Sequence, residues 1–158
     1  MKGKSDRELL ELYARVMRLL RNRNTISSSN NPVADVAEQL AARAFGLTLA
    51  AKSEKGFDGI DGAGVRYQVK GRRLTPENKS TELSIVRNLE DGQFDYLLAI
   101  YFDEFWGIHR AIRMTHEAFA RHASFSSHRN GHRFTLTAAV QEDNECEDVT
   151  SVVSECWG

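Results

Sequence analysis

The sequence is poor in the residues that mark secreted and membrane proteins. It has only two cysteines and two prolines among 158 residues. Small secreted domains usually carry several disulfides, so Cys146 and Cys156 alone favour a reducing compartment. No apolar run approaches the roughly 20 residues of a membrane helix. The opening residues, MKGKSDRELL, contain no apolar signal core. We therefore expect a cytoplasmic protein that does not contact membranes.

The charge of the chain is small in total but uneven along its length. The 21 Lys and Arg stand against 22 Asp and Glu, a formal net charge of −1. Residues 141–158 hold six of the acids and no Lys or Arg, which leaves 21 basic against 16 acidic residues in 1–140, a net +5. A weakly basic body is compatible with a polyanionic ligand, although many domains with this charge bind no nucleic acid.

The length suits one domain, which we divide into three segments. Residues 1–30 form an N-terminal helix and linker, residues 31–140 an α/β core, and residues 141–158 an acidic tail. The tail has no clear periodicity, so we expect part of it to be mobile.

Two amphipathic helices are predicted before residue 47. The first spans residues 5–23, where Ser5 and Glu8 have the spacing of a capping box. We expect this helix to pack on the outside of the fold through apolar residues at helical spacing, namely Leu9, Leu12, Val16, Leu19 and Leu20. The second helix follows a polar loop, with Asn31 as N-cap, Pro32 in the first turn and Gly46 at its end.

Several strands follow the two helices. Residues 47–51, 56–60 and 65–70 read as short strands, with a hairpin turn at residues 61–64. Residues 72–93 are polar and include a short helix. The apolar run 94–102 predicts a central strand buried on both faces. A neighbouring strand at 106–112, a helix at 115–123 and a late strand at 133–138 complete an α/β domain with a mixed sheet flanked by helices.

Four polar residues in this core form a candidate catalytic site. Gln68 and Lys70 project to the same side of their strand because side chains alternate between faces. Pairing across the 61–64 turn brings Asp58 near both of them, and Glu38 on the second helix reaches the same patch. Carboxylate and amide oxygens are ligands that Mg²⁺ accepts. Lys70 stabilises charge on a phosphate or holds a water molecule.

These residues resemble the motif of the PD-(D/E)XK nuclease superfamily, which has the restriction-endonuclease-like fold. The resemblance covers roughly residues 32–112 and includes the order of the elements: a helix with an acid, a strand, a strand with Asp58, a strand with Gln68-Val69-Lys70, a helix and a strand. The chain departs from the motif twice, because Gly56-Phe57 replaces the proline and Gln68 replaces an acid. Active members with Gln-x-Lys are known in the superfamily.

The resemblance implies metal-dependent hydrolysis of a phosphodiester, usually in DNA. Asp58, Gln68 and Glu38 then hold Mg²⁺ or Mn²⁺, and Lys70 helps to orient or activate the attacking water. Restriction, phage defence or repair is the implied setting, and a homodimer through the N-terminal helix is a candidate assembly. The alternative is an inactive module on the same fold that binds nucleic acid or protein.

Basic residues around the motif are candidate contacts to the nucleic-acid backbone. Arg66, Arg72 and Arg73 flank Lys70, although a solvated basic loop explains them nearly as well. Lys79 and Ser80 are weaker candidates of the same kind. For Asp61 we expect a role in starting the turn rather than in binding a metal.

Two further groups of residues have a structural and a functional interpretation. The histidines and the two cysteines supply zinc ligands, but their spacings match no compact zinc motif; the histidines are His109, His116, His122, His128 and His132. The aromatic residues of the central strand and its turn can stack on bases, but core packing explains them better; they are Phe94, Tyr96, Tyr101, Phe102, Phe105 and Trp106.

Overall fold

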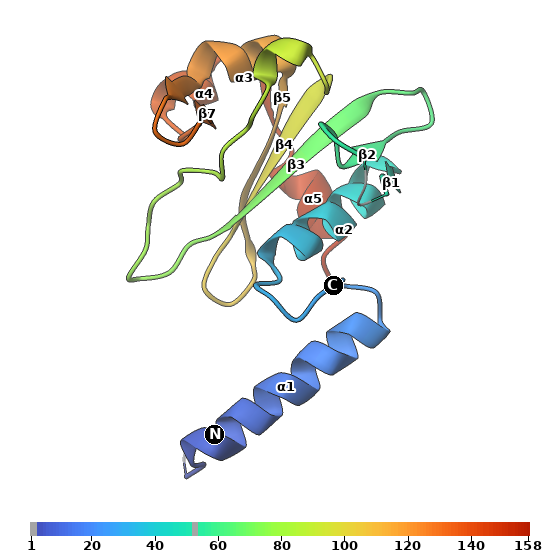
Figure 1. The fold of residues 1–158 in the computed structure, drawn as a ribbon, viewed down its shortest axis with the longest axis vertical. Coiled ribbons are helices and arrows are strands. Elements are labelled where there is room, and N and C mark those ends of the chain that lie inside the picture. The colour runs from blue at the N-terminus through green and yellow to red at the C-terminus, as the bar shows by residue number, and fades with distance from the viewer. Residues whose placement is uncertain (1–2, 52–53) are drawn as a thin grey trace.

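One mixed sheet of six strands forms the centre of the computed structural model, which describes residues 3–51 and 54–158 (Figure 1). The strand order is β1-β2-β3-β4-β5-β8, and only β3 and β4 are parallel. The mixed α/β architecture predicted from the sequence is therefore confirmed. The strands are β1 (Thr48–Leu49), β2 (Gly59–Ile60), β3 (Arg66–Arg73), β4 (Tyr96–Phe102), β5 (Ile108–Thr115) and β8 (Cys146–Asp148).

Strand β4 is the apolar centre of the sheet, as predicted. Residues 97–102 are buried and pair with β3 on one side and with β5 on the other. Their side chains alternate between two cores, so Leu98 and Ile100 face one layer while Leu97 and Tyr101 face the other. A strand buried on both faces must be apolar throughout, and this one is.

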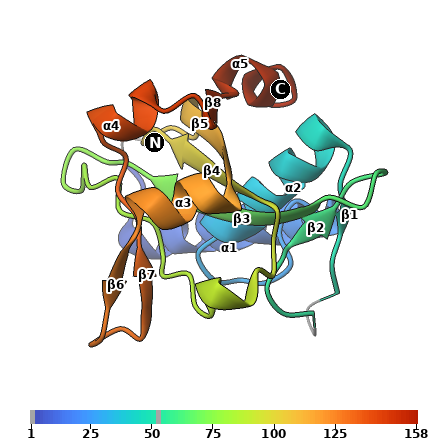
Figure 2. The same ribbon diagram turned by 90° about the horizontal axis from the view of Figure 1, so that it is seen from above.

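Helices cover both faces of the sheet (Figures 1 and 2). Helix α2 (Val33–Phe45) and helix α5 (Thr150–Glu155) pack on one face. The opposite face is covered by the segment before β4, helix α3 (His116–His122), helix α4 (Ala138–Glu142) and the hairpin β6 (Ser124–Ser126)–β7 (Gly131–Arg133).

Close packing of α2 on β3 depends on small residues. Ala37 and Ala41 of α2 are fully buried. A Cβ atom at Gly71 of β3 would lie 2.8 Å from the carbonyl oxygen of Val33 and 2.9 Å from the Cβ of Ala37. Since α2 carries Glu38 and β3 carries Gln68 and Lys70, this contact also sets the width of the candidate site.

Helix α1 (Asp6–Asn22) projects from the rest of the molecule (Figure 1). Its capping box is formed as predicted, with Ser5 and Glu8 as the reciprocal partners. Met17 is the buried residue of the helix. The expectation that its whole apolar face packs on the fold is wrong, because only the C-terminal part of α1 reaches the core.

The segment between β3 and β4 is not the short helix that its sequence suggests. It runs as an irregular chain and contains a single 3-10 turn, η1 (Leu89–Asp91). Leu83 and Val86 enter the core from this chain, and their backbones pair with Phe134 and His132. The late strand was also misplaced, because only residues 131–133 pair as β7 and a helix begins at Ala138.

The acidic tail belongs to the fold, contrary to the expectation of mobility. Strand β8 pairs with β5, and helix α5 buries Val153. The tail acids face arginines of the body, with Arg113 bound to Glu147 and Arg110 bound to Asp148. Part of the positive charge of the body is thus neutralised within the chain. None of the helices in residues 3–51 and 54–158 is long and apolar enough to cross a membrane.

Candidate active site

The β2–β3 hairpin sets the position of Asp58. The backbone N–H of Asp58 donates to the carbonyl of Tyr67 at 2.7 Å, one step before β2 begins. The Asp61 side chain accepts hydrogen bonds from the backbone N–H groups of Ala63 and Val65, at 2.9 and 3.0 Å, and so closes the turn. This agrees with the turn role expected for Asp61. The resulting register brings Asp58 level with Gln68.

Asp58 and Gln68 are in direct contact. The Oδ2 atom of Asp58 accepts hydrogen bonds from the side-chain amide of Gln68 and, at 2.7 Å, from the backbone N–H of Val69. Gln68 therefore acts as a donor here, and its amide must turn over before its oxygen faces a metal beside Asp58. Burial raises the pKa of the Asp58 carboxyl, while the Val69 hydrogen bond, Lys70 and Gln68 oppose this rise.

Lys70 lies next to Asp58 in a partly buried position. Burial lowers the pKa of its ammonium group, and the negative charges of Asp58 and Glu38 counteract that effect. Arg87 lowers the pKa of Lys70 further by charge repulsion. The predicted quartet of Glu38, Asp58, Gln68 and Lys70 therefore comes together in the fold.

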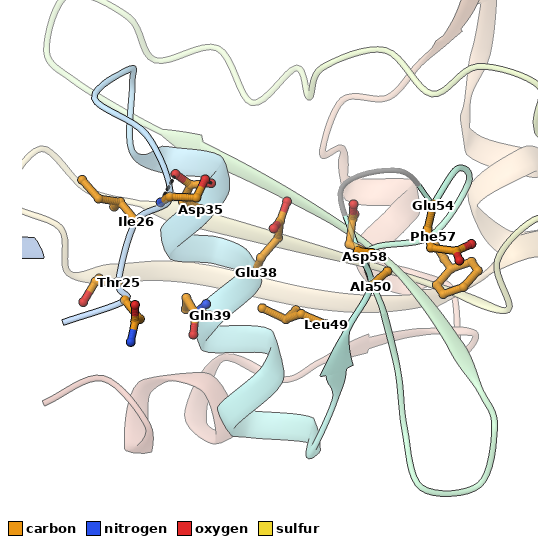
Figure 3. Close-up of a pocket in the computed structure, with 13 residues that line it drawn as sticks. Thr25, Ile26, Asp35, Glu38, Gln39, Leu49, Ala50, Glu54, Phe57 and Asp58 are labelled. Atoms are coloured by element: carbon orange, nitrogen blue, oxygen red, sulfur yellow. Dashed lines mark hydrogen bonds between the residues drawn. The ribbon is translucent and has the colours of Figure 1, made fainter. Parts of the chain in front are cut away.

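Glu38 and Asp58 open into one acidic cleft between α2 and the strands β1 and β2. Figure 3 shows both side chains extending in the same direction, from the helix and from the hairpin. The cleft has a volume of about 540 Å³, and Asp35 and Glu54 also line it. No Lys or Arg is among its lining residues within the described part of the chain. Asp35 accepts hydrogen bonds from the backbone N–H and hydroxyl of Ser27, at 2.8 and 2.9 Å, which leaves Glu38 and Asp58 as the two carboxylates that extend together into the cleft. Carboxylate oxygens are ligands that a divalent metal ion such as Mg²⁺ accepts.

A second pocket, of about 200 Å³, opens beside Gln68 and Lys70 and has the opposite charge. Lys55 and Arg87 complete its basic lining, and no Asp or Glu lines it among the described residues. We call this the basic pocket. Sequence reasoning missed Arg87 because it lies in an irregular segment 17 positions after Lys70, where no periodicity connects the two.

The three arginines expected to bind phosphates have partners inside the protein. Arg66 binds Asp95 through both side-chain oxygens, at 2.9 and 3.2 Å, and so lowers the pKa of that carboxyl. Arg72 donates to the carbonyl oxygen of Ser80 at 3.0 Å and also binds the side chain of Asn78. The two bonds of Arg72 hold the loop after β3, and both guanidinium groups already use part of their donors within the protein.

Arg73 lies apart from the candidate site. It donates to the carbonyl of Glu104 at 2.6 Å, and its guanidinium sits 5.1 Å from the centre of the Trp106 ring. Consecutive residues of a strand face opposite sides, so Arg73 projects away from the side that carries Lys70. Lys79, a weaker candidate, lines a separate pocket near Pro76 and Glu104.

The zinc ligands considered from the sequence are only partly brought together. Potential ligand atoms of His122, Asp143 and Cys146 lie within 4.8 Å of one another. However, Arg121 and His122 both bind the Oδ2 atom of Asp143, each at 2.7 Å. Burial raises the pKa of the Cys146 thiol to about 11, which disfavours the thiolate that zinc requires. A fixed guanidinium and a protonated thiol make this cluster a poor cation site.

Most of the aromatic residues are part of the core, as expected. Phe94, Tyr101 and Phe102 are buried, and Tyr96 stacks on Tyr67 with ring centres 5.6 Å apart. Phe105 differs, because 84% of it is exposed at the turn after β4. It lies outside both pockets of the candidate site.

No protein-family model matches this chain, and no curated protein matches it either. The chemistry of the site is therefore the basis for assigning a function. Its distinguishing feature is a junction of opposite charges. Asp58 lines the acidic cleft, Lys70 lines the basic pocket, and Gln68 connects them through its bond to Asp58.

Proposed function

We propose that this protein is a Mg²⁺- or Mn²⁺-dependent endonuclease that hydrolyses phosphodiester bonds in DNA, in restriction, phage defence or repair. The observation that carries the proposal is the meeting of the acidic cleft and the basic pocket at Asp58, Gln68 and Lys70. A phosphodiester is an anion whose cleavage needs both a cation and hydrogen-bond donors around the reacting phosphate. The acidic cleft offers a place for the cation, and the adjoining basic pocket offers the hydrogen-bond donors.

Asp58 and Glu38 are the residues that would hold the metal. Asp58 supplies a carboxylate fixed by the backbone of Val69, and Glu38 supplies another from the helix that faces it. Hydrolysis of the phosphodiester would use the bound ion to polarise the phosphate and acidify water. Gln68 is the third candidate ligand, through its oxygen, once its amide has turned away from the donor position that it now occupies.

Lys70 is the candidate for orienting or activating the attacking water. An ammonium group whose pKa is lowered by burial gives up its proton more readily than an ordinary lysine. In its charged form, Lys70 stabilises negative charge that develops on the phosphate. Arg87 and Lys55, across the basic pocket, are then the contacts to the scissile phosphate or its neighbour.

The restriction-endonuclease-like fold is part of the same proposal. Support comes from the order of elements, in which a helix with an acid precedes a hairpin with Asp58 and a strand with Gln68 and Lys70. The strand β4 that follows lies parallel to β3 in the mixed sheet. This order agrees with the resemblance to the PD-(D/E)XK superfamily noted from the sequence, except that an irregular chain with one 3-10 turn replaces the helix expected between β3 and β4.

A second candidate function is binding without cleavage, of nucleic acid or of protein. It is favoured by one observation, the donor role of Gln68 toward Asp58, which leaves the motif short of one negative charge. A neutral amide binds Mg²⁺ less strongly than a carboxylate does. The two candidates share the site and differ in their response to metal.

Cleavage of supercoiled plasmid DNA separates the two candidates. We expect nicked and linear products with Mg²⁺ or Mn²⁺ and none after addition of a chelator. Lys70→Ala should abolish cleavage, while Lys4→Ala, a matched change on an exposed lysine outside both pockets, should leave it unchanged. DNA binding without cleavage under all metal conditions would support the binding module, and cleavage by Lys70→Ala at the normal rate would refute the site.

A further inference from the structure

Helix α1 carries a long apolar face that the rest of the chain does not cover. Leu9, Leu12, Val16 and Leu19 are between 38% and 56% exposed. Their spacing of three, four and three residues is the heptad spacing of helices that pair with other helices. Tyr13 is also more than half exposed on the same side. A contiguous apolar strip of this kind on an exposed helix marks an interaction surface.

The position of α1 makes an uncovered face costly. A helix of 17 residues is only marginally stable in water without tertiary contacts. Contact with the body is limited to the C-terminal part of the helix, where Met17 is buried and Leu20 packs on the core. The remaining turns project into solvent in this single chain (Figure 1).

The face of α1 also borders an apolar groove of about 780 Å³. From the helix the groove is lined by Tyr13, Val16, Met17 and Leu20, and from the body by Val36, Trp106 and Trp157. The Trp157 indole N–H donates to the carbonyl of Trp106 at 2.6 Å, which holds that wall of the groove in place. The groove therefore extends the apolar face of α1 toward the body.

The charges along α1 identify what covers this face. The first half of the helix carries the acids Asp6, Glu8 and Glu11 against one arginine, whereas the second half carries Arg15, Arg18 and Arg21 and no acid. A second copy of the same helix complements this pattern only when it runs antiparallel. A parallel copy would set acid against acid and arginine against arginine, which is unfavourable.

The apolar spacing fits the same antiparallel arrangement. Consider a two-fold axis that crosses the contact at the level of residue 14 along the helix. It places Leu9 opposite Leu19 of the second copy and Leu12 opposite Val16 of the second copy. Every residue of the exposed row then meets another apolar residue.

We infer that this protein is a homodimer in which the α1 helices of two copies pack antiparallel through Leu9, Leu12, Val16 and Leu19. The contact is isologous, so it closes on itself and does not produce filaments. The pairing depends on α1 alone and holds whether or not the candidate active site cleaves DNA.

Sedimentation of the full chain tests the dimer. We expect a dimer mass for the native sequence over the micromolar range and a monomer mass for the double variant Leu12→Glu, Val16→Glu. Leu10→Glu is the matched control, because Leu10 is 67% exposed but lies outside the heptad row. Far-UV circular dichroism and thermal unfolding establish that each variant keeps the folded body. A monomer mass for the native chain would overturn the inference.

Cysteine cross-linking tests the antiparallel direction. In that arrangement residue 12 of one helix lies opposite residue 16 of the other, so an equimolar mixture of Leu12→Cys and Val16→Cys should form a disulfide between positions 12 and 16 under mild oxidation. Mass spectrometry of the digested product identifies which positions are joined. Disulfides that join two copies of the same variant, with none between positions 12 and 16, would show that the antiparallel pairing is wrong.

Discussion

The side-chain amide of Gln68 donates a hydrogen bond to the carboxylate of Asp58. This bond connects the strand that carries Lys70 to the wall of the acidic cleft. It also explains how a glutamine occupies a position where an acid would repel Asp58 in the absence of a metal. Gln68 stabilises the metal-free site and, by the same bond, keeps its own oxygen turned away from the cleft.

Gln68→Glu should make the fold more dependent on metal. The variant loses the donor to Asp58 and places two carboxylates side by side, so it should unfold at lower temperature than the native protein in a chelator. Mn²⁺ should then raise its melting temperature by more than it raises that of the native protein. Differential scanning calorimetry with and without Mn²⁺ provides the comparison. An equal response of both proteins to Mn²⁺ would remove position 68 from the metal site.

Asp58→Asn should stabilise the metal-free protein at neutral pH. Burial raises the pKa of Asp58 in the folded state, so folding favours the protonated carboxyl, and the charged form opposes folding above that pKa. An asparagine carries no charge, so it removes the cost of burying the carboxylate. Its side-chain oxygen still accepts the hydrogen bond from the Val69 N–H. Chemical denaturation in a chelator should show the gain at pH 7 and its loss at a pH below the pKa of an ordinary aspartate. The same variant should bind Mn²⁺ much more weakly in calorimetric titration.

Cleavage should depend on the protonation of Lys70. Burial lowers the pKa of its ammonium group, so a role as proton acceptor predicts that kcat/KM rises with pH until the neutral amine predominates. Lys70→Arg keeps a positive charge but cannot lose its proton. We expect this variant to lose the rise and to lose about 10²–10³-fold in rate. A pH profile that is the same for the variant and the native enzyme would limit Lys70 to charge stabilisation.

Arg87→Ala should weaken DNA binding in a salt-dependent way. If Arg87 contacts one phosphate, its removal reduces the slope of log K against log salt concentration by about 0.9. Arg7→Ala on α1 is the matched control, because Arg7 is exposed and far from the basic pocket in sequence and structure. Fluorescence anisotropy with a labelled duplex at several salt concentrations measures both slopes. Identical slopes for the two variants would exclude Arg87 from the interface.

Gly71→Ala should disturb both the fold and the metal site. The added Cβ meets the backbone of Val33 at 2.8 Å, so α2 must move away from β3. Overpacking of this kind typically lowers the free energy of unfolding by about 1–3 kcal/mol. Since α2 carries Glu38, Mn²⁺ affinity should fall as well. Gly62→Ala in the hairpin turn, where nothing lies within 4 Å of the new Cβ, is the control.

Several features were predictable because their signals are local. The capping box of Ser5 and Glu8, the turn at Asp61 and the N-cap at Thr115 each depend on residues two to four positions apart. The predicted start of α2 was nearly correct. The helix begins at Val33, and the N–H of Val33 donates a hydrogen bond to the side chain of Asn31. Local geometry leaves few alternatives for such residues.

The grouping of the candidate site was predictable for the same reason. A tight turn fixes which residues of a hairpin face one another, so Asp58 had to lie near Gln68. Lys70 then follows by the alternation of a strand. Only Glu38 required a tertiary assumption, namely that the helix before the hairpin packs beside it.

The sequence by itself determined the ends of α1, α2 and α3, the hairpin register and the buried central strand, since these depend on neighbours in the chain. The tertiary structure decided the pairing of β8 with β5, the irregular path before β4 and the partners of the arginines. Those features join segments tens of residues apart, such as Arg66 with Asp95 and Arg113 with Glu147. An arginine has the same sequence signature whether it binds a phosphate or a carboxylate, and only the fold places its partner beside it.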